Sequence, residues 1–215
     1  MPTIEASLPD LEELLGIQLP REEEELNSVF SYIKGEVSSL RGEIVNIEIK
    51  DSNHPDLWSV EGVARSLKGF LDIALGFRDY SIMGDSKVVI RVDERLKDVR
   101  PYIGSSVVKG VHLSDAALRS LMHLQDKLDQ TYGRGRRRTS IGLYDYDLIT
   151  PPIEYTLKSP DEYSFTPLGF GEEMTLREII QRHPKGIQYG WIIEGYHEWP
   201  LLVDEEGPLM VAFDN

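Results

Sequence analysis

Cysteine is absent from the 215 residues of this chain. Its absence excludes disulfide bonds, thiolate catalysis and metal sites with cysteine ligands. The sequence also has no apolar run of the ~20 residues that a membrane-spanning helix needs. Its opening, MPTIEASLPDLEELL, lacks the basic start and the apolar segment of a signal peptide. These absences favour a cytoplasmic protein that makes no contact with a membrane.

Positive charge is scarce. The chain has 23 lysines and arginines against 37 aspartates and glutamates, which gives a formal net charge of −14. An acidic surface repels phosphate, so this balance disfavours general binding of nucleic acids. One local basic site is still compatible with it.

Sequence patterns for metals and cofactors are also lacking. None of the five histidines stands at a recognised ligand spacing from another histidine or from a carboxylate. The segment GRGRRR at 133–138 lacks the Gly-Lys-Ser/Thr ending of a phosphate-binding loop. We therefore expect no bound metal and no cofactor in this chain. The histidines are His54, His112, His123, His183 and His197.

Hydrophobic periodicity predicts an α+β fold with two modules, a small N-terminal α+β domain at 1–93 and a mixed-sheet domain at 94–215. Apolar residues at helical spacing predict helices at 8–19, 22–33, 53–75 and 114–131, and a further helix within 174–186 that opens with a capping box from Thr175 to Glu178. Alternating and β-branched residues predict strands at 87–94, 102–113, 139–149 and 153–158, a strand or hairpin around Gly42, and a hairpin at 199–213 that turns at DEEG.

The densest positive charge lies just after the helix predicted at 114–131. Four of the residues 134–138 are arginines, namely Arg134, Arg136, Arg137 and Arg138. Cations at the C-terminus of a helix stabilise it by about 0.3–1 kcal/mol each when exposed. The cluster is denser than such capping requires, so a contact with nucleic acid is the second interpretation. The residues alone leave both open.

Two aspartates follow the arginines. Asp145 and Asp147 alternate with Tyr144 and Tyr146, so in an extended strand both carboxylates would lie on one face. Paired carboxylates can share acid–base catalysis. Aspartates at this spacing more often cap a following turn, and the spacing alone favours that structural role.

Several segments, in order, resemble one protein family. NHPDLWSVEGVARSLKGFL, RRRTSIGLYDYDLI, FTPLGF, MTLREIIQRHPKG and WPLLVDEEG are similar to motifs of the phenylalanyl-tRNA synthetase β subunit of the archaeal and eukaryal type. The opening MPTIEASLPDLEELLG resembles the start of that subunit. The resemblance covers almost the whole chain and corresponds to the N-terminal region, including part of the editing domain.

The resemblance implies a function. In this family the β subunit pairs with an α subunit that carries aminoacylation, and the editing domain hydrolyses tyrosine wrongly attached to tRNA(Phe). An apolar pocket rejects an added hydroxyl by only about 100-fold, so a second site is needed. The family implies that the arginine cluster meets the acceptor end of the tRNA and that a pocket binds an aromatic amino acid. The residues implied for that pocket are Leu143, Tyr144, Asp145, Asp147, Phe165, Leu168 and Leu202.

The sequence departs from the family at several of these positions. Tyr144 and Tyr146 replace the usual His and Leu, and Val211 stands where a Ser is usual. The Pro-Pro-Ile-Ile-Asn run that follows in the family is not found, and the pattern identifies no catalytic nucleophile or base. We therefore keep two alternatives to an editing hydrolase: a non-catalytic scaffold that binds tRNA or a subunit, and a regulator that binds an aromatic amino acid.

Overall fold

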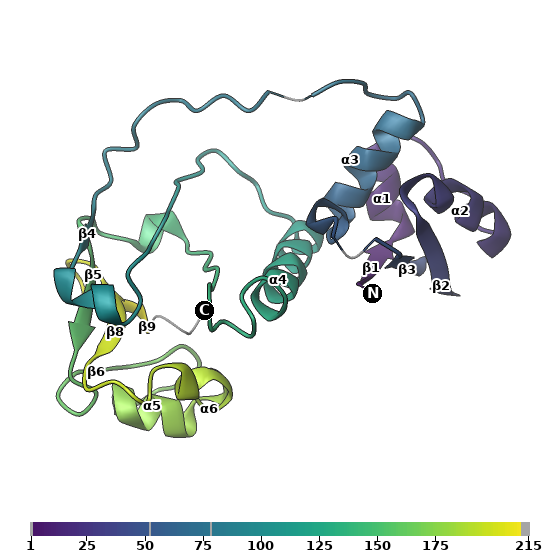
Figure 1. Ribbon diagram of the computed structural model, residues 1–215. Coiled ribbons are helices and arrows are strands. Elements are labelled where there is room, and N and C mark those ends of the chain that lie inside the picture. The colour runs from purple at the N-terminus through teal and green to yellow at the C-terminus, as the bar shows by residue number, and fades with distance from the viewer. Residues whose placement is uncertain (1, 52, 78, 212–215) are drawn as a thin grey trace. The chain divides into compact units, whose positions relative to one another are not determined.

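The computed structural model describes residues 2–51, 53–77 and 79–211. It confirms the predicted α+β class (Figure 1). The chain divides into two units, Met1–Ser81 with His112–Leu128, and Ile82–Val111 with Asp129–Asn215. This division differs from the sequence-based boundary after residue 93, because most of the helix predicted at 114–131 packs on the core of the first unit through Leu124 and Leu128.

The first unit is built on an antiparallel sheet in the order β1-β3-β2. Its inward-facing residues Val45, Ile47 and Ile49 are fully buried, because a strand with one covered face points alternate side chains into the core. The predicted hairpin is confirmed, and Gly42 supplies the positive φ of its turn. The strands are β1 (Thr3–Ser7), β2 (Gly35–Arg41) and β3 (Ile44–Ile49), and the covering helices are α1 (Leu8–Leu15), α2 (Glu23–Phe30) and α3 (Val60–Phe70).

The helix predicted at 8–19 ends at Leu15. Gly16 takes the left-handed conformation, with a φ of 79°, and its N–H donates to the carbonyl of Glu12. The buried Glu12 carboxylate then accepts from the backbone N–H of Leu19 at 2.7 Å and pairs with Arg21 at 2.7 Å. These contacts fold residues 16–21 back on the helix instead of extending it.

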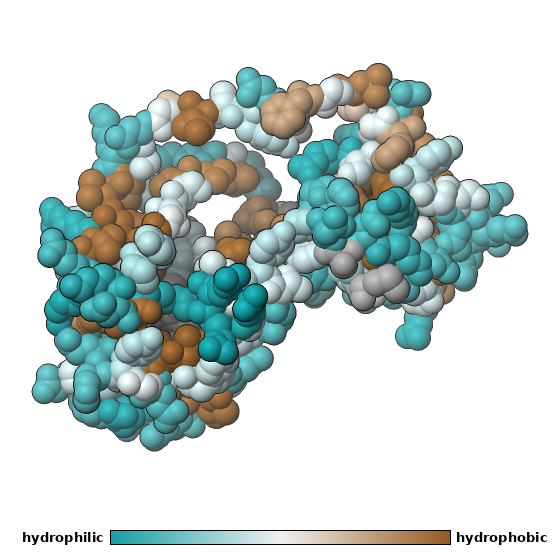
Figure 2. All heavy atoms as spheres, viewed as in Figure 1, coloured by the Kyte–Doolittle hydropathy of each residue, from teal (hydrophilic) through white to brown (hydrophobic). Residues whose placement is uncertain are grey.

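The helix predicted at 53–75 is also shorter than expected. A 3₁₀ turn occupies Pro55–Leu57, and α3 begins only after Ser59, whose hydroxyl accepts from the N–H of Gly62 at 3.1 Å. No helix or strand forms in the described residues between α3 and β4, and several apolar side chains of that segment are exposed, as Figure 2 shows.

The second unit contains a mixed sheet in the order β4-β5-β8-β9, in which only β4 and β5 run parallel. The predicted capping box is confirmed, with Thr175 and Glu178 bonded in both directions. The predicted hairpin is confirmed between β8 and β9, and residues 212 and 213 of its predicted range lie outside the described residues. The strands are β4 (Ile90–Val92), β5 (Ile153–Lys158), β6 (Ser164–Phe165), β7 (Met174–Thr175), β8 (Trp199–Val203) and β9 (Pro208–Val211), and the helices are α5 (Leu176–Arg182) and α6 (Pro184–Tyr189).

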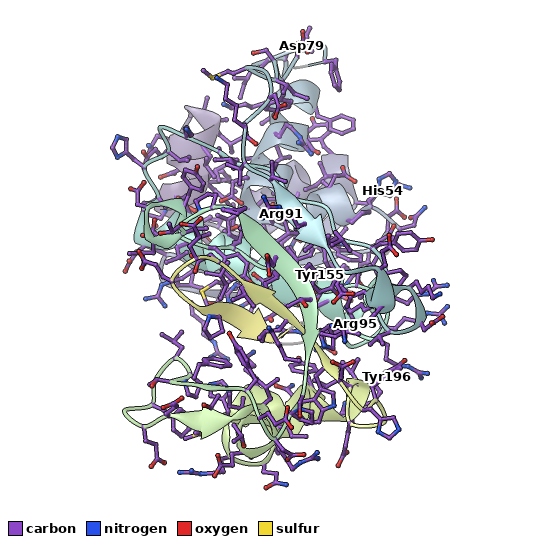
Figure 3. The ribbon with its side chains drawn as sticks, turned by 90° about the vertical axis from the view of Figure 1, so that its left-hand side faces the viewer. His54, Asp79, Arg91, Arg95, Tyr155 and Tyr196 are labelled. Atoms are coloured by element: carbon purple, nitrogen blue, oxygen red, sulfur yellow. The ribbon has the colours of Figure 1, made fainter. Side chains whose placement is uncertain are left out.

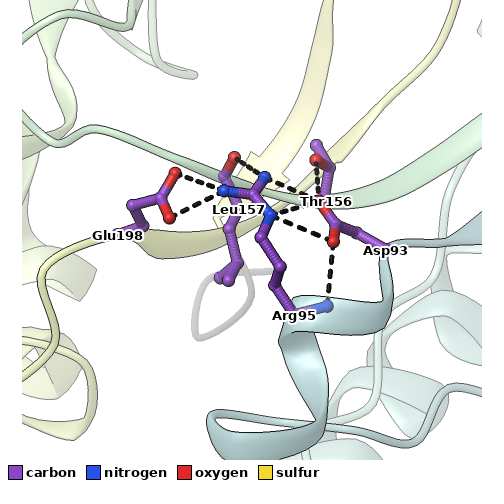
Figure 4. Close-up of polar contacts among 5 residues, drawn as sticks. All are labelled: Asp93, Arg95, Thr156, Leu157 and Glu198. Carbon is purple, nitrogen blue, oxygen red and sulfur yellow. Dashed lines mark hydrogen bonds and ion pairs between the residues drawn. The ribbon is translucent and has the colours of Figure 1, made fainter.

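One ion-pair network joins three parts of this second unit. Arg95, on the 3₁₀ turn Glu94–Asp98, donates to both carboxylate oxygens of Asp93 and to both of Glu198, at 2.7–3.1 Å (Figure 4). The Arg95 guanidinium holds the pKa of Asp93 at about 2. Beside it, Tyr155 on β5 is buried and donates to the carbonyl of Arg100 at 3.0 Å (Figure 3). The network therefore connects the segment after β4 with β5 and with the entry to β8.

Two predicted strands are wrong. Residues 102–113 and 139–149 form no ladder, and the second range contains only the 3₁₀ turn Tyr146–Leu148. Val108 and Val111 are 70% and 54% exposed, so their β-branched side chains are not packed on a sheet. Helix α4 (Asp115–Gln130) is confirmed between these segments.

Candidate nucleic-acid interface

The arginine cluster lies in a tight turn, residues 131–138, which we call the arginine turn. A Cβ atom at Gly133 would lie 2.5 Å from the carbonyl oxygens of both Asp129 and Thr139, so only glycine fits there. Arg134, Gly135 and Arg136 then take positive φ values of 51°, 64° and 66°. This conformation is unfavourable for arginine and persists only where surrounding contacts impose it.

The contacts that impose it converge on Asp129, in the last turn of α4. Its carbonyl accepts from the N–H groups of Gly135 and Arg136 at 2.9 and 3.2 Å. Its carboxylate lies 3.0 Å from Nε of Arg136 and accepts from the N–H of Ile141 at 3.1 Å. Asp129 and Arg136 are each only 1% exposed. One buried residue, through its carbonyl and its carboxylate, thus holds the middle of the arginine turn and the residue Ile141 beyond it.

Arg136 also packs against an aromatic ring. Its guanidinium lies 4.3 Å from the centroid of Tyr189, within the range of a favourable cation–π contact. The Tyr189 hydroxyl accepts from the side chain of Gln130 at 2.9 Å. Arg136 is therefore enclosed by α4 and α6 and contributes to the folding of the second unit.

This burial is at odds with the role that we expected for Arg136. The family resemblance implied that all four arginines meet phosphates, but a guanidinium that is 1% exposed and paired with Asp129 does not reach a ligand in solution. Arg134, Arg137 and Arg138 are exposed. Arg136 thus contributes to the structure after the helix, whereas the contact of its exposed neighbours with nucleic acid stays a prediction.

An exposed aromatic side chain lies beside these arginines. Trp191, on the 3₁₀ turn Gly190–Ile192, is 52% exposed, and the guanidinium of Arg137 lies 5.9 Å from its ring centroid. In Figure 2 a strongly hydrophilic patch covers the segment that follows α4. Cations that bind phosphate next to an aromatic face are the combination that single-stranded nucleic acids require. The exposure of Trp191 is not evident from the sequence, because a tryptophan followed by two isoleucines is equally compatible with a core segment.

The residues expected to form an amino-acid pocket do not come together in one enclosed site. Leu168 is 92% exposed, and Leu143 and Tyr144 are 54% and 40% exposed. Leu202 packs on a small core that contains Tyr155 and is separate from the cluster on which Phe165 packs. Of the seven residues, Phe165 alone lines the open hollow that lies beside the turn between β8 and β9.

Asp145 has the structural role that the spacing of the two aspartates favoured. The Asp145 carboxylate accepts from the N–H of Asp147 at 3.1 Å and caps the 3₁₀ turn Tyr146–Leu148. Asp147 is exposed. Because this segment forms a 3₁₀ turn and not an extended strand, the alternation of a strand does not place the two carboxylates on one face.

The hollow beside Phe165 has a volume of about 310 Å³. Asp204 at its wall accepts from the N–H groups of Thr150, Glu206 and Gly207 at 2.8–3.0 Å. Burial acts to raise the pKa of Asp204, but these N–H donors outweigh it and hold the pKa below its usual range. This carboxylate therefore favours its ionised form, and its oxygens accept hydrogen bonds from Thr150 and from the turn between β8 and β9. The other lining residues are Leu148, Thr166, Pro208 and Leu209.

Within the described residues, no three His, Asp or Glu side chains come together in a way that could hold a metal ion. Over the same part of the chain, every helix is too short or too polar to cross a bilayer.

Comparison with known proteins places the chain among characterised relatives, although no protein-family model matches it. It is 43% identical over 214 residues to the phenylalanine–tRNA ligase beta subunit of Thermococcus kodakarensis, covering 98% of this chain and 37% of that protein. The corresponding subunit of Pyrococcus horikoshii is 42% identical over the same length, with 38% of that protein covered. The chain thus spans somewhat more than a third of these relatives.

A solved structure shows the same fold. An N-terminal fragment of the phenylalanyl-tRNA synthetase beta subunit from Pyrococcus horikoshii superimposes with a TM-score of 0.90 at 40% identity. The match covers 98% of this chain and 61% of that fragment. The sequence comparison and the structural comparison therefore point to similar proteins, each over 98% of this chain.

Proposed function

Because the chain is homologous over nearly its whole length to the N-terminal region of phenylalanine–tRNA ligase beta subunits, we propose that it takes part in phenylalanyl-tRNA aminoacylation by binding the single-stranded acceptor end of tRNA(Phe). The observation that carries this proposal is the arginine turn. Arg134, Arg137 and Arg138 are exposed together on a chain whose net charge is −14. Phosphates would be attracted to this turn and repelled by much of the remaining surface.

The homology also supports a partner for the chain. The relatives are named as beta subunits, which implies an alpha subunit beside them. We propose that this chain assembles with such a subunit in the cytoplasm, and that the alpha subunit supplies the aminoacylation site. The arginine turn would then position the tRNA and would not itself catalyse the reaction.

Salt titration of tRNA(Phe) binding tests the role of the arginine turn. Each phosphate contact on a single strand adds about −0.7 to the slope of log K against log salt. Three exposed arginines therefore predict a slope of about −2. The triple variant Arg134→Ala/Arg137→Ala/Arg138→Ala should bind weakly with a nearly flat slope. Matched and unmatched tRNAs should be affected alike, because phosphate contacts carry no sequence information.

A second triple variant provides the matched control. Arg65, Arg91 and Arg119 are exposed arginines outside the turn, and changing them to alanine alters the net charge by the same amount. This control should keep the wild-type slope. Equal flattening in both triple variants would mean that overall charge, and not the arginine turn, governs binding, and the proposal would be wrong.

Editing is the second candidate function, favoured by the hollow beside Phe165. Its volume of about 310 Å³ lies at the lower end of the range for ligand pockets. We propose that this hollow contributes to an aromatic amino-acid site and that other residues are needed to close it, since Leu168 and Leu143 are exposed.

Deacylation of pre-charged Tyr-tRNA(Phe) measures the editing activity directly. We expect this chain by itself to hydrolyse the ester slowly or not at all, because the implied pocket is open and a positioned water needs an enclosed site. An intact beta subunit of a relative serves as the positive control. A comparable rate for this chain would show that the open pocket suffices, and a purely binding role would be excluded.

A further inference from the structure

We propose that Trp191 is a stacking platform for one unpaired RNA base, with Arg137 as the partner of that nucleotide's phosphate. This inference rests on the proposed RNA-binding function and gives the site a second kind of contact. Phosphate contacts alone hold a strand without selecting unpaired nucleotides, whereas stacking requires a base that is free of its duplex neighbours.

The exposure of Trp191 is unusual within this chain. The other two tryptophans, Trp58 and Trp199, are 4% and 0% exposed, whereas Trp191 is 52% exposed. The next residues point the other way: Ile193 is 1% exposed, and Ile192 packs on the core of the second unit. The backbone of this turn thus directs the indole outward while its neighbours anchor it inward.

The indole is held in place. Its Nε1 donates to the carbonyl of Gln188 at 3.1 Å, so its one polar atom is satisfied within the protein. Gly190 brings the turn close to α5, since a Cβ atom there would lie 2.7 Å from Cβ of Ile180. A ring that is already oriented loses little conformational entropy when a base stacks on it.

Arg137 supplies the matching charge. Its guanidinium lies 5.9 Å from the Trp191 ring centroid, on the arginine turn that the buried Asp129–Arg136 pair holds in shape. A nucleotide whose base lies on the indole presents its phosphate to this guanidinium. Arg138 and Arg134 are exposed on the same turn and can receive the adjoining phosphates.

An exposed tryptophan is also typical of protein–protein hot spots. The arginines beside it favour an anionic polymer, and the net charge of −14 makes this turn an exception on the chain. RNA is therefore the occupant that we infer, and a protein partner is an outcome that the experiment can detect.

Intrinsic fluorescence can isolate the proposed contact, because Trp191 is the exposed tryptophan of the three. The probes are a short single-stranded RNA of adenosines and an abasic strand with the same number of phosphates. We expect the adenosine strand to quench the emission of the wild-type chain and to bind more tightly than the abasic strand. Trp191→Ala should weaken binding of the adenosine strand by about 5- to 150-fold and leave binding of the abasic strand unchanged.

Two further variants guard against a folding effect. Trp191→Phe keeps a flat ring and should retain most of the affinity, and circular dichroism should show an unchanged fold for both Trp191 variants. Phe77→Ala removes a ring that is 94% exposed in the first unit and should leave RNA binding unchanged.

The outcomes separate this inference from the proposed function. Equal affinity of the wild-type chain for the two strands, or wild-type affinity in a folded Trp191→Ala variant, would overturn the stacking role while phosphate binding by the arginines remained. Quenching of Trp191 by a purified alpha subunit but not by RNA would assign the surface to a protein partner and would likewise overturn it. No binding of tRNA or of either strand would contradict both proposals.

Discussion

At the scale of single residues, the four arginines of one short segment have two different roles. Arg136 is buried against Asp129 and Tyr189, and its neighbours face solvent. Nothing in the sequence RGRRR distinguishes them, because the difference depends on a carboxylate seven residues earlier, near the end of α4, and on a ring more than fifty residues later. The site was therefore only partly predictable. The sequence indicated the segment, but it did not indicate which of the arginines is buried and which are exposed.

The burial of Arg136 gives a stability prediction. Arg136→Ala leaves the Asp129 carboxylate buried without its charge partner, and breaking such a pair costs about 3–5 kcal/mol in the free energy of unfolding. Urea denaturation measures this change. Arg138→Ala is the matched control and should shift the free energy by less than about 0.5 kcal/mol, because Arg138 is exposed.

The double variant Asp129→Ala/Arg136→Ala adds a sharper check. Its cost should be clearly smaller than the sum of the two single variants, since neither charge then remains buried alone. Strict additivity, or a single Arg136→Ala variant as stable as the wild type, would mean that the pair does not organise the turn.

At the scale of helices and strands, local signals predicted well and long-range pairing did not. The capping box at Thr175, the turn at Gly42 and helix α4 follow from a few neighbouring residues, and all three are confirmed. Strand β1 was missed, because TIEAS offers only Ile4 and Ala6 as buried apolar residues and its pairing with β3 lies some forty residues away. The apolar residues of 102–113 suggested a strand, but a strand also needs a neighbour with free hydrogen-bonding groups.

The ends of the helices likewise depend on local contacts that hydrophobic periodicity does not reveal. The apolar pattern predicted α1 and α3 to be longer than they are. One local contact sets each limit: the left-handed Gly16 ends α1, and the hydroxyl of Ser59 caps the start of α3. Where such a contact involves a residue within about three positions, the sequence can indicate it. The Glu12–Arg21 pair that folds back the segment after α1 is too distant for that.

At the scale of the whole molecule, the charge distribution is the main functional feature. A chain of net charge −14 repels polyanions over most of its surface. An exposed basic turn would therefore both attract a polyanion toward that one place and contact it there. The order of motifs along the sequence predicted the resemblance to phenylalanyl-tRNA synthetase β subunits, and relatives at 43% and 42% identity and a solved fragment with a TM-score of 0.90 confirm this similarity. The surface that we propose for RNA binding could be identified only from the structure, because the exposure of a side chain is a property of the fold.

Ultraviolet crosslinking of the chain to tRNA(Phe), followed by mass spectrometry of the modified peptides, locates the RNA contact most directly. We predict adducts on the peptide that contains Trp191 and on the peptides of the arginine turn, and their loss as salt rises. Adducts confined to the first unit, within Thr3–Ser7, Gly35–Arg41 or the helices that cover this sheet, would contradict the assignment of the interface to the arginine turn.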